Sequence, residues 1–203
     1  MPLPILSVLV IIFILWLQYE IRKSSKKSDA ASASFWEREA KSNLVRRVDI
    51  SNLSYLTIRP EQLPLSDNKD ETINSYRDII LGLINKKVIN LSRYNNTDLK
   101  NKYGAANLPQ LQEYDNNYTI LISILQKWAQ RLYQQGDIQG SKAILEYAVS
   151  LHSDAANTYR LLAEIYKSEK TPEKIDHLIE TIPELNMYEQ DKLIAELKTF
   201  KHI

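Results

Sequence analysis

Apolar side chains recur at steps of three and four residues through most of the chain after residue 70. Ile73, Tyr76 and Ile80 follow this spacing, and further along Leu125 and Leu132 follow it as well. Such steps place side chains on one face of an α-helix. The chain also holds only 4 glycines, too few for the many tight turns of a β-sandwich or barrel. The pattern therefore predicts an all-α domain.

Turn and capping residues divide the region after residue 118 into helices. Gly136 indicates the C-terminal turn of the first helix, and Asp137 is placed to cap the second. We expect the third helix to begin at Ser153-Asp154. Pro172 falls at the first position of the fourth helix, where the missing N–H of proline costs no hydrogen bond. These signals predict two helical hairpins in succession.

The two hairpins repeat each other after 34 residues. The apolar and small positions of the first hairpin are Leu125, Trp128, Ala129, Leu132, Ile138, Ser141, Leu145 and Ala148. The corresponding positions of the second are Tyr159, Leu162, Ala163, Tyr166, Pro172, Ile175, Ile179 and Ile182. The period and the large–small pairs resemble the tetratricopeptide repeat. Ser141 and Ile175 depart from it, because the family usually has alanine there.

The tetratricopeptide resemblance implies a scaffold that holds other protein chains. In that family the first helix of each hairpin lines a concave surface. The register of the repeat places the following residues on that surface: Ser123, Gln126, Gln130, Tyr133, Gln134, Asn157, Arg160, Glu164, Lys167 and Ser168. Their amide, hydroxyl and mixed-charge groups predict a neutral or mixed peptide held by amide hydrogen bonds, with Arg160 as the best anchor. An ordinary solvated helix face is the alternative.

Shorter helices are expected before the repeats. Asn95 to Asp98 offers an N-cap for one of them, and Asn107-Leu108-Pro109 starts another. The polar run Asp115–Asn117 predicts a break or bend in the latter helix. The alternative is a continuous helix that runs into the first repeat.

The N-terminal run from Leu3 to Tyr19 is almost wholly apolar and carries no charge. Its 17 residues are at the short end of what spans a bilayer core of about 30 Å. A cleaved signal peptide is the competing interpretation, but no basic segment precedes the run. Lys/Arg residues follow it, so the positive-inside rule places the C-terminal side in the cytoplasm. The sequence predicts a single-pass cell-membrane protein that contacts the membrane through residues 3–19.

The segment after the apolar run changes character twice. Lys23–Ser34 is polar and small, which predicts a flexible tether. Ser34 and Glu37 have the spacing of a capping box and predict a short helix. The β-favouring run Tyr55–Ile58 has no second strand near it, so we expect an extended strip lying on the helical domain.

A second resemblance covers most of the chain. It rests on two blocks: Trp36, Glu37, Arg38, Glu39, Asn43, Arg46, Arg47, Tyr55, Leu63 and Pro64, then Asn96, Thr97, Asp98, Leu99, Lys100, Tyr103, Gly104, Ala105, Asn107, Leu108 and Pro109. In these residues the chain resembles uncharacterised membrane-anchored proteins of anaerobic Gram-positive bacteria. That resemblance implies no activity.

The predicted organisation combines these segments in chain order. It comprises a transmembrane anchor (1–21), a flexible tether (22–34), a short helix with an extended strip (35–66), N-terminal helices of the soluble domain (67–118), two tetratricopeptide-like hairpins (119–185) and a C-terminal capping helix (186–203). The capping helix suits the end of a helical repeat, which must cover its apolar face. The fold class expected is all-α, with one transmembrane helix and one soluble helical domain.

Composition and spacing argue against several functions. Lys+Arg is 26 and Asp+Glu is 25, so no net field favours nucleic acid. Cysteine is absent, and His152, His177 and His202 are scattered. No glycine-rich phosphate loop or metal-ligand spacing occurs. We therefore expect no catalysis, cofactor, metal or small-molecule substrate.

Two functions follow from this sequence. The favoured one is a membrane-anchored adaptor whose helical domain binds a protein or peptide. The alternative is a structural subunit of a membrane complex, in which the 35–65 strip fills the groove of its own chain.

Overall fold

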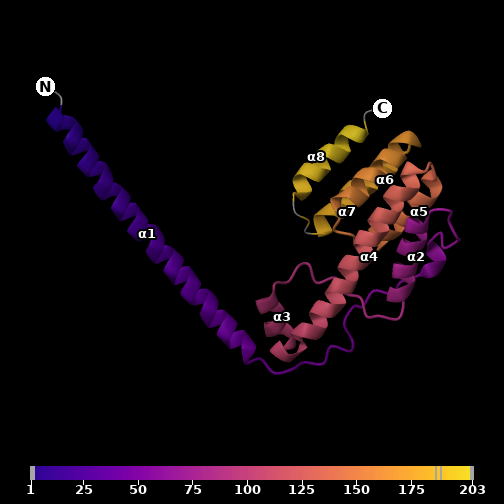
Figure 1. The fold of residues 1–203 in the computed structure, drawn as a ribbon, viewed down its shortest axis with the longest axis horizontal. Helices are drawn as coiled ribbons and strands as arrows, with labels where there is room; N and C mark the ends of the chain where they lie inside the picture. Colours follow the sequence, from indigo (N-terminus) through magenta and orange to yellow (C-terminus); the bar gives the residue numbers. More distant parts are fainter. Residues whose placement is uncertain (1–2, 186, 188, 202–203) are drawn as a thin grey trace. The chain divides into compact units, whose positions relative to one another are not determined.

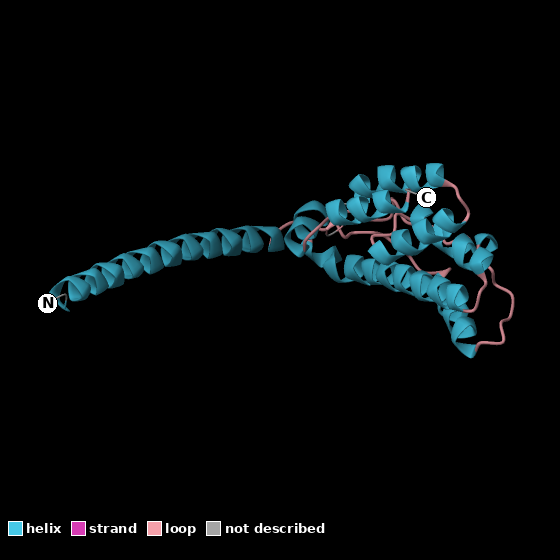
Figure 2. Cartoon of the chain, turned by 90° about the horizontal axis from the view of Figure 1, so that it is seen from above, coloured by secondary structure: helices cyan, strands magenta, loops and turns pink. Residues whose placement is uncertain are grey.

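The computed structural model describes residues 3–185, 187 and 189–201. Helices and loops make up the described chain, and its only β pairing is an isolated antiparallel bridge between Leu56 and Val88 (Figure 2). Two compact units are present. The first contains the chain up to Ile50 together with Asn95–Leu108, and the second contains Ser51–Tyr94 and the chain from Pro109 onward. The helical content of both units confirms the all-α prediction.

Helix α1, Leu3–Asn43, is a single helix of 41 residues. It includes the predicted anchor, the predicted tether and the short helix expected at Phe35. The prediction of a flexible tether over 22–34 was therefore wrong. The physical reason is that α1 contains no glycine and that its only proline, Pro4, lies in the first turn, where it does not interrupt the helix.

The predicted membrane anchor is also corrected. Among the described residues, no helix is long and apolar enough to cross a membrane. The apolar run ends after 17 residues, which in a helix extend about 26 Å, less than the roughly 30 Å of a bilayer core. This finding overturns the transmembrane helix and the single-pass localisation deduced from it. The membrane contact through residues 3–19 stays a prediction.

In the first unit, α1 packs against α3, Asn96–Tyr103, and α3 in turn contacts the turn η2, Ala105–Asn107. Glu39 accepts hydrogen bonds from Lys100 and from the Thr97 hydroxyl, the latter at 2.7 Å, and Lys100 lowers the pKa of the Glu39 carboxyl. Asn107 is fully buried. Its amide nitrogen donates to the carbonyls of Val48 and Tyr103 at 2.6 and 2.7 Å. These contacts hold the end of α1 and the following turn against α3.

The second unit contains the helices expected from the apolar spacing (Figure 1). They are α2 (Glu71–Leu83), α4 (Leu108–Gln134), α5 (Ile138–Ser150), α6 (Ala156–Ser168), α7 (Pro172–Thr181) and α8 (Gln190–Phe200), with the short turns η1 (Pro60–Gln62) and η3 (Ile182–Leu185). Helix α6 packs against α5, α7 and α8. One apolar core runs through the unit, with Trp128 and Tyr159 among its largest fully buried side chains.

The hairpin boundaries agree with the capping signals. Gly136 adopts a φ of +84°, a conformation that other residues rarely adopt, and the Asp137 side chain accepts a hydrogen bond from the Gly140 N–H at 2.9 Å. Pro172 opens α7 as predicted. The third helix begins later than expected, at Ala156. Ser153 is buried in the preceding link, where its carbonyl accepts a 2.8 Å hydrogen bond from the Tyr159 hydroxyl.

Helix α4 is continuous, so the break predicted at Asp115–Asn117 was wrong. The polar side chains face a partner rather than ending the helix. Asp115 accepts a 2.8 Å hydrogen bond from the Leu91 N–H, and the Asn117 amide donates to the Lys87 carbonyl at 3.0 Å. The two side chains bind the backbone of the segment before α3, an arrangement that helix periodicity alone does not reveal.

Replacing Asp115 with asparagine is expected to raise the melting temperature at neutral pH. Burial raises the pKa of the Asp115 carboxyl; the hydrogen bond from the Leu91 N–H partly opposes this shift, and the negative charge of Asp154 adds to it. A raised carboxyl pKa contributes stability at low pH that is lost as pH rises through the folded-state value. Asparagine keeps an acceptor for Leu91 without the charge. The gain in melting temperature should shrink toward about pH 3, where the Asp115 carboxyl is protonated in both the folded and the unfolded state.

Thermal unfolding at several pH values tests this, with Glu113→Gln as the control. Glu113 is an exposed carboxylate on the same helix, so its neutralisation should change the melting temperature little. An Asp115→Asn protein that is less stable at neutral pH than the wild type would contradict the prediction.

The later part of the strip belongs to the core of the second unit. Ile58 and Leu63 are buried, with 5% and 7% of their surface exposed. The Arg59 N–H donates a 2.8 Å hydrogen bond to the Tyr147 hydroxyl on α5, and Leu56 pairs with Val88 through the isolated bridge. The strip therefore lies on the helices as predicted, and it packs against α5.

Helix α8 takes the place of the predicted capping helix, with Leu193 and Leu197 buried. Its N-cap residue, Glu189, makes no capping hydrogen bond through its side chain. Asn186, the first residue of the predicted capping helix, is outside the described residues, as is His202.

Candidate protein-binding face

The residues predicted to line a binding surface all remain at least partly accessible. We call this set the docking face. Gln134, Asn157, Glu164, Lys167 and Ser168 are exposed, and Ser123, Gln126, Gln130, Tyr133 and Arg160 are half-buried. The first hairpin contributes its members from α4, and the second contributes its members from α6. Exposure of this kind is a necessary condition for a docking role.

Polar contacts link the docking face from helix to helix. The Tyr133 hydroxyl on α4 donates a 3.0 Å hydrogen bond to Glu164 on α6, and the pKa of Tyr133 is raised by burial and by this carboxylate. Arg160 on α6 contacts both carboxylate oxygens of Glu196 on α8, at 3.0 and 2.8 Å. Helices α4, α6 and α8 therefore form a continuous series, and α8 extends the face beyond the two predicted hairpins.

Arg160 is already paired within the chain, which changes the role expected for it. Besides Glu196, it donates to the Asn157 side chain at 3.0 Å. An arginine held in this way is oriented, but a ligand carboxylate must compete with Glu196 for it. Glu196 was missed in the sequence because it lies outside the two hairpins. Its spacing of 36 residues from Arg160 does not match the predicted 34-residue period, so no sequence signal pointed to it.

A groove of about 330 Å³ lies beside α4, where the N-terminal helix α2 borders it. Helix α4 lines it with Gln126, Lys127, Gln130, Arg131 and Gln134, and α2 lines it with Thr72 and Tyr76. We call this the α2–α4 groove. Three of the predicted docking residues are therefore in a concave site, together with two cations and a tyrosine that the repeat register did not select.

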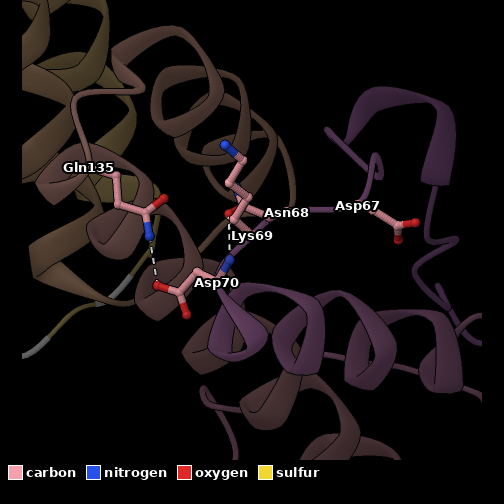
Figure 3. A pocket seen from close by; sticks show the side chains of 5 residues that line it. All are labelled: Asp67, Asn68, Lys69, Asp70 and Gln135. Carbon is pink, nitrogen blue, oxygen red and sulfur yellow. Dashed lines mark hydrogen bonds between the residues drawn. The ribbon is translucent and has the colours of Figure 1, made fainter.

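Asp70 fixes the end of the α2–α4 groove. It caps α2 by accepting a 2.9 Å hydrogen bond from the Thr72 N–H. Its other oxygen accepts from Arg131 of α4 and from Gln135, the residue after α4, each at 2.6 Å, and the Arg131 guanidinium lowers the pKa of the Asp70 carboxyl. Figure 3 shows Gln135 reaching Asp70 while Asp67 points away from it. The loop before α2 is thereby attached to the end of α4.

The described residues contain no group of three or more His, Asp or Glu side chains able to hold a metal ion. The docking face and the α2–α4 groove offer amides, hydroxyls and paired charges. Such groups recognise a ligand by hydrogen bonding.

Comparison with known proteins identifies no relative of this chain: no family model, no curated protein and no solved structure matches it. The tetratricopeptide resemblance and the resemblance to proteins of anaerobic bacteria therefore both stay predictions.

Proposed function

We propose that this chain is a protein-interaction adaptor without catalytic activity, and that a protein or peptide binds its docking face. The observation that carries the proposal is the polar series across α4, α6 and α8, in which Tyr133 pairs with Glu164 and Arg160 with Glu196. Tyrosine and arginine are, with tryptophan, the residue types enriched among the residues that dominate binding energy. Here both are held by neighbouring helices, so little side-chain freedom is lost on binding.

A tetratricopeptide-like arrangement is part of the proposal. The small residues Ala129, Ser141, Ala148 and Ala163 are fully buried, as the close approach of paired helices requires. Two hairpins are fewer than such arrays usually need. Helix α8 supplies a further surface after the second hairpin, and α2 supplies one before the first.

The alternative function is a structural subunit whose groove is filled by its own strip. The packing of the strip bears on it. Ile58 and Leu63 are in the apolar core, so this part of the strip belongs to the fold and does not merely occupy a groove. The strip also contacts α5 through Tyr147, and α5 contributes no residue to the docking face. This favours a docking face that remains available to a partner.

The adaptor proposal predicts that the double variant Tyr133→Ala, Arg160→Ala loses its partners. We expect captured proteins to bind it at least about tenfold more weakly, the change that about 1.4 kcal/mol produces. The full chain serves as bait, and quantitative mass spectrometry compares the wild type with the variant. Circular dichroism verifies that the variant stays helical, which we expect because both side chains are half-buried at most.

Glu146→Ala is the matched control. Glu146 accepts a 2.8 Å hydrogen bond from Tyr166, a pairing of the same kind, but it lies on α5. Its loss should leave partner capture unchanged. If the double variant retains every partner that the wild type captures, the docking face is not the binding site and the proposal fails.

A further inference from the structure

Three glutamines follow one another along the α2–α4 groove. Gln126, Gln130 and Gln134 are each four residues apart on α4, and all three line the groove. Residues at this spacing lie on one face of a helix, one turn above another. The groove therefore presents a row of carboxamides, and each carboxamide has both a donor and an acceptor.

The spacing of this row matches an extended peptide. Four residues of α-helix rise about 6.0 Å, and because such a row is inclined to the helix axis by about 26°, the step along it is about 6.7 Å. Two residues of an extended chain advance about 6.6–6.8 Å. Successive glutamines can therefore face alternate residues of an extended segment, and each glutamine can pair with the backbone C=O and N–H of the residue it faces.

Charge in the groove favours acidic side chains on the ligand. The lining residues include Lys127 and Arg131 and no carboxylate. Arg131 is paired with Asp70, whereas Lys127 has no partner among the described residues. An amphipathic helix fits this site poorly, because helix-in-groove recognition needs an apolar lining. Tyr76 supplies the only aromatic surface among the lining residues.

We propose that the α2–α4 groove binds an extended, acidic peptide segment of a partner protein, with its backbone paired to Gln126, Gln130 and Gln134 and an acidic side chain at Lys127. This inference rests on the proposed adaptor function and names the chemistry of the partner. The glutamines bind without regard to side-chain identity, since they contact the backbone. Lys127 provides the selectivity for a negative charge.

The test uses the full chain and a displayed library of random nonapeptides. Enriched peptides should be rich in Asp and Glu. A synthetic copy of an enriched peptide, measured by fluorescence anisotropy, should bind Gln130→Ala about tenfold more weakly than the wild type. Alanine is a good helix former, so this change leaves α4 intact. The control is Gln139→Ala, which removes a glutamine from α5 outside the groove and should leave binding unchanged.

A charge reversal tests the selectivity separately. Lys127→Glu should abolish binding of the acidic peptides and enrich Lys- and Arg-containing ones when the library is selected again. Full binding of the acidic peptides by either Gln130→Ala or Lys127→Glu would overturn the proposal. So would a wild-type selection that yields no peptides or peptides without acidic bias.

A single-stranded oligothymidylate serves as a second probe, because Lys127 and Arg131 could also contact phosphates. We expect no binding of it. Binding of the oligonucleotide that depends on Lys127, without binding of any peptide, would overturn the proposal in favour of a nucleic-acid site. If captured partners depend on Tyr133 and Arg160 but not on Gln130, this inference fails while the adaptor function stands.

Discussion

Replacing Trp128 with alanine is expected to lower the free energy of unfolding by about 3–5 kcal/mol, the range for removing a large aromatic side chain from a core. Trp128 is only 1% exposed and is among the largest fully buried side chains. A loss of this size is a large part of the roughly 5–15 kcal/mol that stabilises a typical domain. Chemical denaturation of the full chain, monitored by circular dichroism, measures this loss of free energy.

Two control variants separate packing from other effects. Trp128→Phe should cost much less, because the indole N–H has no hydrogen-bond partner among the described residues and the ring is largely retained. Lys127→Ala, at the exposed neighbouring position, should be nearly neutral. If Trp128→Ala melts at the wild-type temperature, the packing of α4 in the second unit is wrong.

Truncating the strip at Ile58 and Leu63 together is expected to destabilise the second unit by about 4 kcal/mol or more, since each large-to-small change of this kind costs about 2–5 kcal/mol. Both side chains are in the same apolar core as Trp128, although the only helical turn between them is the short η1. The measurement is again denaturant unfolding, with Thr57→Ala, Gln62→Ala as the matched control. Those two neighbours are exposed.

The strip variant also distinguishes the two proposed functions. If replacing Ile58 and Leu63 destabilises the protein, the strip is part of the fold. A strip that merely filled a groove could be truncated with little loss of stability, and partner binding at the docking face would then increase. Unchanged stability together with new partner binding would therefore support the self-filled groove over the adaptor.

Several features of the fold were predictable because their causes are local. Gly136 and Asp137 place a turn and a cap by backbone conformation and one side-chain hydrogen bond, so no distant contact is needed. Pro172 opens α7 for an equally local reason. The burial of Trp128 follows from the steps of three and four that place it with Leu125 and Leu132.

One error arose where a distant segment decided the outcome. Asp115 and Asn117 indicate a helix break when their neighbours alone are considered, but both bind the backbone of residues 87–91 and α4 continues. The membrane span predicted over the apolar run after Leu3 was wrong for a different reason. The run has 17 residues, which in a helix extend about 26 Å, less than the roughly 30 Å of a bilayer core.

The docking face also has features that the sequence predicted and features that only the tertiary structure shows. Helical spacing was enough to select Gln126, Gln130 and Gln134 as one row, because the period of a helix is a property of the backbone itself. That α2 borders this row, and that Glu196 pairs with Arg160, was decided by how helices far apart in the chain pack. The sequence by itself determined most of the helices of the second unit, their apolar faces, and the helix ends at Gly136, Asp137 and Pro172. Tertiary packing alone decided which polar residues meet, because such contacts depend on the burial of distant apolar faces against one another and not on any local preference.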